Sequence, residues 1–239
     1  MATFLPGGAA LWVLSAAALA GAISAAATGL KARGRISGPV WQTVKSGLHR
    51  ILSHRPLAVV TGASTLSQLG QGGLAVAAVA LSIERIGTPG EGALLVTAFA
   101  VGSLIGALYE TIRPTRARPH AVMMLGFLAT GLLTIGAAFN FGTVWTITAI
   151  GLSGLFTAPT SAAMLFLRSH LSPPHLRSQI FTVGAGFRAT ASAAGAGLAA
   201  SATGFGGGLA VAGIGVIWVV SAALMARYPA GASPASTVS

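Results

Sequence analysis

The sequence predicts an all-α integral membrane protein with about seven transmembrane helices. Seven long apolar stretches divide the 239-residue chain, and each can cross a hydrocarbon core about 30 Å thick at about 1.5 Å of rise per residue. They fall at 9–30, 57–83, 92–112, 120–139, 143–167, 178–200 and 206–228. Charged residues make up only 7% of the chain and its mean hydropathy is +0.80, as is typical of helices that lie in lipid.

The basic residues gather on one side of these stretches. The chain has 14 Lys and Arg against three acidic residues, a net charge of +11. Twelve of the 14 lie on one side, after the first, third and fifth stretches and at the C-terminal end of the seventh: Lys31, Arg33, Arg35, Lys45, Arg50, Arg55, Arg113, Arg116, Arg118, Arg168, Arg177 and Arg227. Arg85 lies on the opposite side and Arg188 inside a stretch. Because basic residues mark the cytoplasmic side, we expect a multi-pass plasma (inner) membrane protein with its N-terminus outside and its C-terminus in the cytoplasm.

Four segments organise the chain. Residues 1–30 form the first predicted transmembrane helix, 31–56 a cytoplasmic loop, 57–228 a six-helix transmembrane bundle and 229–239 a disordered tail. Within the loop, apolar residues recur at helical spacing opposite a polar face; they are Val40, Trp41, Val44, Leu48, Ile51 and Leu52. This pattern predicts an amphipathic helix in the headgroup layer, which we interpret as a structural tether.

The predicted helices differ in polarity. Hydroxyl and amide side chains recur in 57–83, 143–167 and 178–200, whereas 120–139 and 206–228 are almost wholly apolar. Since polar side chains avoid lipid, the polar stretches should line a cavity and the two apolar ones should lie at the periphery. The candidates for lining a path through this cavity are Ser64, Gln68, Gln71, Thr157 and Arg188.

Three of these candidates have competing interpretations. Arg188 lies near the middle of its stretch, where a charge costs at least about 2.5–3.5 kcal/mol to insert. It either anchors a negatively charged or strongly polar ligand group or bonds to helix carbonyls as a structural residue. Gln68 and Gln71, three residues apart on one helix face, either line the path or join two helices by hydrogen bonds.

Glycines predict where helices approach closely. Gly102 and Gly106 form a G-x-x-x-G pair in the third stretch, and the sixth stretch carries Gly184, Gly195 and Gly197. Small residues at such spacing are typical of packed transmembrane helices.

Several local patterns occur in the order of one known family. Trp41–Leu57 (WQTVKSGLHRILSHRPL) is similar to a central cytoplasmic loop that enters a seventh helix. Gly106–Arg116 (GALYETIRPTR) is similar to a G-x-x-x-D-R-x-G-R-R loop. Ala158–Arg177, Gln179–Phe181 and Gly195–Gly197 are similar to a helix-ten to helix-eleven region. Together these residues resemble the C-terminal half of a major facilitator superfamily transporter, preceded by its sixth helix and closest to drug and metabolite exporters.

This resemblance implies helices six to twelve of a secondary transporter that moves a small molecule, in the efflux direction, by alternating access. A separate or missing N-terminal half would supply the first five helices, and we expect the chain to be inactive without it. The family's cytoplasmic gating loop would comprise Gly106, Glu110, Arg113 and Arg116, although Thr111 stands where the family has Arg after the acid. The two apolar stretches become helices nine and twelve, which are peripheral in that fold.

One enzyme hypothesis competes with transport. Gly151–Gly154 (GLSG) matches the G-x-S-G of intramembrane rhomboid proteases, in which Ser153 would need a histidine base. The histidines that follow, His170 and His175, belong to a predicted cytoplasmic loop, so we expect chance packing and no enzyme activity. An ABC-type permease would need a docking helix for an ATPase, and we find none. A non-transporting structural or assembly protein stays open.

Composition also bears on cofactors and partners. The chain has no cysteine, and its histidines and acidic residues form no ligand cluster in the sequence, so we expect no cofactor and no metal site. The basic residues flank apolar stretches without interleaved aromatic residues, which argues against nucleic acid as a partner. The expected partners are the lipid bilayer and an unidentified small molecule.

Overall fold

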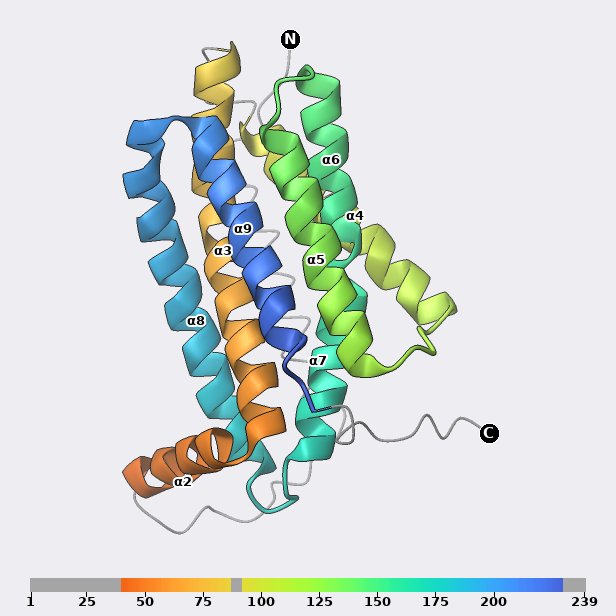
Figure 1. Cartoon of the computed structure of the whole chain (residues 1–239), viewed down its shortest axis with the longest axis vertical. Helices are drawn as coiled ribbons and strands as arrows, with labels where there is room; N and C mark the ends of the chain where they lie inside the picture. The colour runs from red at the N-terminus through yellow and green to blue at the C-terminus, as the bar shows by residue number, and fades with distance from the viewer. Residues whose placement is uncertain (1–39, 87–91, 230–239) are drawn as a thin grey trace, which may run out of the picture. The chain divides into compact units, whose positions relative to one another are not determined.

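A computed structural model describes residues 40–86 and 92–229 of the chain. The predicted helix at 9–30, the start of the following loop and almost all of the predicted tail lie outside the described residues. Within the described ranges the regular elements are helices, as Figure 1 shows. Their bounds are α2 Val40–Ser53, α3 Arg55–Ile86, α4 Gly92–Ile112, α5 Pro119–Ala138, α6 Thr143–Leu155, α7 Thr157–Leu171, α8 Arg177–Ala202, the 3₁₀ turn η2 Thr203–Phe205 and α9 Gly207–Met225.

Five segments of the described part are long and apolar enough to span a membrane. They are Arg55–Arg85, Gly92–Ile112, Pro119–Ala138, Thr143–Leu171 and Gly207–Met225, and each coincides with a predicted stretch. The all-helical character of this part, with five helices suited by length and composition to span a membrane, is therefore confirmed. The remaining stretch, 178–200, forms α8, which has sufficient length at 26 residues but is less apolar because it contains Arg188 and many small residues. That α8 spans the membrane, and that the helices total seven, stay predictions.

Large apolar side chains cover the outward faces of these helices. Leu104 on α4, Leu132 on α5 and Val216 on α9 are each at least half exposed, with 60%, 55% and 51% of their surface accessible. A water-soluble monomer rarely exposes such a continuous apolar surface. This apolar surface is suited to contact with the hydrocarbon chains of lipids.

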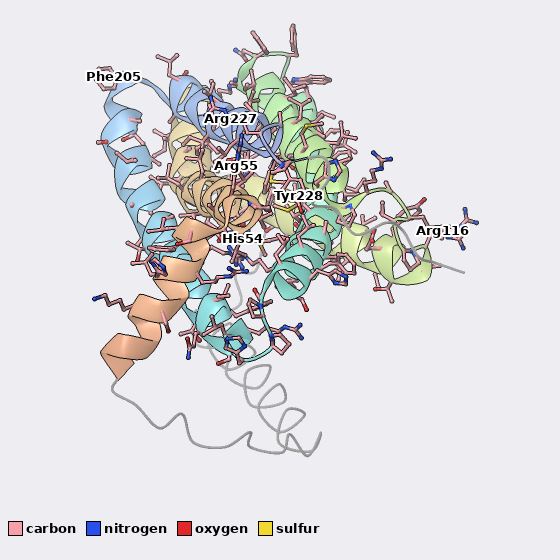
Figure 2. All side chains as sticks on the ribbon, turned by 60° about the horizontal axis from the view of Figure 1, so that its bottom comes forward. His54, Arg55, Arg116, Phe205, Arg227 and Tyr228 are labelled. Atoms are coloured by element: carbon pink, nitrogen blue, oxygen red, sulfur yellow. The ribbon has the colours of Figure 1, made fainter. Side chains whose placement is uncertain are left out.

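The helix directions bring basic residues to one end of the bundle. α3, α5 and α8 run one way, and α4, α6–α7 and α9 run the other way (Figure 1). Arg55, Arg116 and Arg227 consequently lie at the end that comes forward in Figure 2, whereas Phe205 lies at the far end. Arg85, at the end of α3, shares the end of Phe205. The uneven charge distribution is therefore present in space, and its assignment to the cytoplasm stays a prediction.

The long helices form two three-helix repeats of opposite orientation. The first is α3–α4–α5 and the second is α6/α7–α8–α9, with α6 and α7 acting as one rod. α3, the first helix of the first repeat, packs on α8 and α9 of the second repeat. In the same way the α6–α7 rod, which begins the second repeat, packs on α4 and α5 of the first. α5 and α9 pack on each other. Exchanging the two repeats preserves these contacts, as a pseudo-two-fold axis between the repeats would require.

Glycines make the closest approaches in both repeats. A Cβ on Gly195 of α8 would overlap the Leu69 carbonyl of α3, and one on Gly102 of α4 would overlap the Gly151 carbonyl of α6. These crossings, α3 with α8 and α4 with α6, are equivalent under the exchange of the repeats. Helix backbones in lipid come this close where small residues remove the side chains between them.

A third glycine contact joins α5 and α9, the two helices that exchange with one another when the repeats are exchanged. A Cβ on Gly131 would lie 2.7 Å from the Gly215 carbonyl oxygen, and a Cβ on Gly215 would lie 2.7 Å from the Gly131 carbonyl oxygen. This reciprocal contact is what a two-fold relation between α5 and α9 requires.

The second repeat begins with a broken helix. α6 ends at Leu155, and α7 begins after Phe156 with Pro159 in its first turn. Proline lacks the N–H that would bond to the carbonyl four residues earlier, so the Leu155 carbonyl is released from the helix ladder. Gly106 of α4 lies directly against this carbonyl. The break therefore shapes the contact between α4 and the α6–α7 rod.

α2 confirms the predicted amphipathic helix, with a narrower packed face than the sequence indicated. It lies across the basic end of the bundle (Figure 1), where Ile51 is 2% exposed and joins Leu57 and Ile180 in a small apolar cluster. Leu52, which we assigned to the same face, is 69% exposed. α2 packs against α8, where the Ser46 hydroxyl donates to Gln179 Oε1 at 2.7 Å, so this face serves the bundle.

Candidate functional site

A polar cavity of about 40 Å³ lies among α3, α5, α7, α8 and α9. Its floor consists of buried side chains of α5 and α9: Phe127, Thr130 and Trp218 are each no more than 6% exposed. Its mouth includes Gln71 of α3 and Ser161 of α7, both exposed. The cavity therefore opens away from the layer of α5 and α9, which lies in front of α3 and α7 in Figure 1. It has room for a few waters or for one small polar group.

The structure brings the five path candidates together along this cavity. Ser64, Gln68 and Gln71 reach it from α3, Thr157 from α7 and Arg188 from α8. Their convergence is a finding about position, and their role in a transport path stays a prediction. The two helices expected at the periphery also contribute, because their inner faces form the floor.

The two glutamines bond to one another along α3. Gln68 Nε2 donates to Gln71 Oε1 at 2.7 Å. This bond orders the two amides at the mouth, and it lies within one helix, unlike the interhelical bond we considered from the sequence.

Thr157 joins the break between α6 and α7 to the neighbouring helix α4. Its hydroxyl is within hydrogen-bond distance of the Gly154 carbonyl oxygen, at 2.6 Å, and of the Ser103 hydroxyl of α4, at 2.9 Å. The side chain thus compensates part of the disturbed helix ladder and holds α7 against α4.

Arg168 is the residue of this region that the sequence reasoning missed. We placed it in a basic cytoplasmic gap because the predicted stretch ended at residue 167, but α7 continues to Leu171 and buries the arginine to 2% exposure. Its Nη2 donates to Ser64 Oγ at 2.6 Å. A signal was present, since Arg168 follows Thr160 and Met164 at steps of four, on the helix face that lines the cavity.

Arg188 and Arg168 approach one another beside the cavity. Arg168 lies against Gly184 of α8, and Arg188 follows Gly184 by four residues on the same face of that helix. Gly184 of α8 makes room for this approach, because a Cβ there would lie 3.1 Å from Arg168 Nη1. The Nε atoms of both arginines are buried without a hydrogen-bond partner among the described residues.

The predicted gating residues lie elsewhere, around the carboxyl end of α4. Gly106 packs against the α6–α7 break, while Arg113 and Arg116 are exposed. Glu110 accepts hydrogen bonds from the Thr115 backbone N–H at 2.9 Å and from the Thr115 hydroxyl at 2.6 Å. The carboxylate at the motif's acidic position therefore holds the turn between α4 and α5.

Ser153 forms hydrogen bonds inside the helix bundle. It is fully buried, its hydroxyl donates to the Ile150 carbonyl oxygen at 2.7 Å, and its own carbonyl accepts from Thr130 Oγ1 at 3.2 Å. This geometry lends no support to the protease alternative. Across residues 40–86 and 92–229, no group of three histidine or acidic side chains is placed to hold a metal ion.

Comparisons of the chain with protein-family models, with curated protein sequences and with solved structures found no match. The fold itself therefore gives the class: in its described part, an all-helical protein with five helices suited to span a membrane, arranged as two inverted repeats around a polar cavity.

Proposed function

We propose that this chain is part of a secondary transporter of the major facilitator type, which moves a small molecule across the plasma membrane, in the efflux direction, by alternating access. The observation that carries the proposal is the inverted three-helix repeat with a polar cavity between its members. Six-helix halves of major facilitator transporters contain such 3+3 inverted repeats, and their substrate sites lie near the bilayer midplane.

The depth of the cavity supports this function. Gln68 is about 20 Å along α3 from its start, and Thr157 is about 21 Å along the Thr143–Leu171 rod, at 1.5 Å of rise per residue. Both positions are near the middle of a hydrocarbon core about 30 Å thick, given that the helices extend beyond it. Polar side chains are tolerated at this depth where they face water or one another.

The open mouth supports a second half. Gln71 and Ser161 are exposed polar side chains near the middle of membrane-spanning segments, where contact with lipid is unfavourable. Five further helices, in the same polypeptide or a separate one, would form the other half with the predicted helix at 9–30, cover this side and complete a path. The resemblance to the C-terminal half of a major facilitator transporter likewise implies that an N-terminal half covers this side.

A single cysteine at the mouth tests this function, since the native chain has none. With the other half present in the membrane, we expect Ser161→Cys to react with a membrane-impermeant maleimide in both right-side-out and inside-out vesicles, because alternating access opens the cavity to each side in turn and the reaction requires a thiolate in water. Val216→Cys, on the 51% exposed outer face of α9, is the matched control and should stay unlabelled.

Labelling of Ser161→Cys from one side only would indicate a static cavity and contradict alternating access. Labelling no faster than that of Val216→Cys would show that the mouth faces lipid, as in a non-transporting structural protein.

A further inference from the structure

We propose that the cavity binds the oxyanion of a small organic anion, a carboxylate or a phosphate, between Arg168 and Arg188. The inference names a ligand class for the cavity described above, and it rests on the proposed function for the claim that the bound anion is transported.

Two positive charges meet here from different helices. Arg168 comes from the last turn of α7 and lies against Gly184 of α8, while Arg188 comes from the middle of α8, one turn beyond Gly184 on the same face. Arg168 cannot escape to water, because it is 2% exposed and is enclosed by Ser64 and Gly184. A buried guanidinium near a second positive charge is costly, and an anion bound between the two would offset that cost.

The acidic side chains of the described part are engaged elsewhere. Glu84 accepts from the backbone N–H groups at the start of α9, and Glu110 accepts from Thr115. Glu91 is the one acidic residue outside the described ranges. Within the described ranges, no acidic side chain is left to neutralise Arg168 and Arg188, so a bound anion would fill this role.

Unused donors point to an oxyanion in particular. Arg168 uses Nη2 for Ser64, and the Nε atoms of both arginines are buried without partners in the part of the chain that the structure describes. A guanidinium presents its N–H donors as a planar fork that matches the two oxygens of a carboxylate or phosphate. An oxyanion between the forks would satisfy donors that are costly to bury unpaired.

The size of the cavity limits what enters it. About 40 Å³ accommodates one charged group, so the rest of the anion would extend towards the mouth. There the ordered amides of Gln68 and Gln71 offer hydrogen-bonding groups to a polar remainder. A ligand with an oxyanion at one end and a polar body is the class that fits.

Trp218 provides a reporter, because it lines the cavity and is 3% exposed. We would replace the other tryptophans, Trp12, Trp41 and Trp145, with phenylalanine and titrate the purified full chain at constant ionic strength. The probes are sodium succinate, sodium glycerol phosphate, sodium chloride and phosphatidylglycerol micelles. We expect a saturable change in fluorescence with succinate or glycerol phosphate and none with chloride.

Charge variants assign the change to the arginines. Arg168→Gln and Arg188→Gln should each raise Kd roughly tenfold or more, as the loss of a charge-assisted hydrogen bond implies. Arg227→Gln, exposed beyond α9, is the matched control and should leave Kd within about twofold. If Arg168→Gln fails to fold, Arg188→Gln and the charge-retaining Arg188→Lys, which should weaken binding less, carry the test.

Other outcomes would overturn the inference. An equal response to chloride would indicate an unselective halide site, and a response to phosphatidylglycerol alone would indicate a lipid headgroup site. Unchanged affinity in both glutamine variants would remove the arginines from the site. Oxyanion binding together with one-sided labelling of Ser161→Cys would uphold the ligand class and refute transport. Two-sided labelling without oxyanion binding would uphold alternating access and refute the ligand class.

Discussion

Glu84 and Arg85, consecutive residues at the end of α3, hold two other helices by opposite charges. The Glu84 carboxylate accepts from the backbone N–H groups of Gly207 and Gly208, at the positive end of the α9 dipole. Arg85 Nη2 donates to the Ala138 carbonyl oxygen at 2.6 Å, at the negative end of α5. One turn of α3 thus caps both helices that meet at the pseudo-axis.

We predict that Glu84→Gln lowers the free energy of unfolding by about 1 kcal/mol, because the amide keeps the size of the side chain but loses its charge at a helix N-terminus. Arg85→Gln should cost about 1–3 kcal/mol, since buried carbonyls lose a charged donor. Thermal unfolding in one detergent would measure both. Glu110→Gln, whose bonds stay within one exposed turn, is the control, and a loss as large as that of Glu84→Gln would contradict the capping role.

The five path candidates show what sequence could establish at this scale. Their polarity within apolar stretches identified them, because a polar side chain in lipid needs a partner or water. Polarity could not indicate that Arg168 belongs with them, since the predicted apolar stretch ended at residue 167, whereas α7 ends at Leu171. It could not pair Arg168 with Ser64 either, because that contact depends on how α7 packs against α3.

The contact between α5 and α9 depends on the absence of side chains at its glycines. A Cβ on Gly215 would lie 2.6 Å from Ile135 Cγ1 and 2.7 Å from the Gly131 carbonyl oxygen, so the helices must move apart to accept it. Gly213, two residues earlier on α9, has nothing within 4 Å of the same position.

We therefore predict opposite effects of two alanine substitutions on one helix. Gly215→Ala should destabilise the protein by about 1–3 kcal/mol through overpacking at the contact with α5. Gly213→Ala should be neutral or stabilise by up to about 1 kcal/mol, because alanine restricts the unfolded backbone and favours helix. Thermal unfolding in detergent compares them directly. Equal melting temperatures would show that α5 and α9 are not in contact at Gly215.

Glycine spacing in the sequence predicted some of these contacts. Gly102 and Gly106 were singled out as a pair, and both pack against the α6–α7 rod. Gly197 was also singled out, but it faces open space. Gly131 and Gly215 were not noticed, because their helices stood out only as apolar. Spacing shows that a helix has a small-residue face, and the fold determines which face meets a neighbour.

The whole molecule is organised by a symmetry that the sequence does not display. The apolar stretches predicted where five membrane-suited helices begin and end, because hydrophobicity and length are local properties. The pairing of α3 with α8 and of α4 with α6 is a property of packing between distant segments. Polarity ranking likewise separated the cavity walls from α5 and α9, but it could not reveal that Phe127 and Trp218 form the floor.

The orientation of the bundle and the crossing of α8 can be tested together. His175 precedes α8 and Phe205 follows it, and both are exposed, Phe205 to 80%. His175 shares the end of the bundle where basic residues gather, and translocating such a cluster is unfavourable. We therefore predict that this end is cytoplasmic and that α8 crosses the membrane despite Arg188.

In right-side-out vesicles, an impermeant maleimide should label Phe205→Cys at once and His175→Cys only after the membrane is permeabilised. The reverse order would place the basic end outside and contradict the orientation. Labelling of both from the same side would mean that α8 does not cross, and Arg188 would then not reach the middle of the bilayer. Labelling from opposite sides would place Arg188, near the centre of a 26-residue helix, at the depth that an anion-binding role in transport requires.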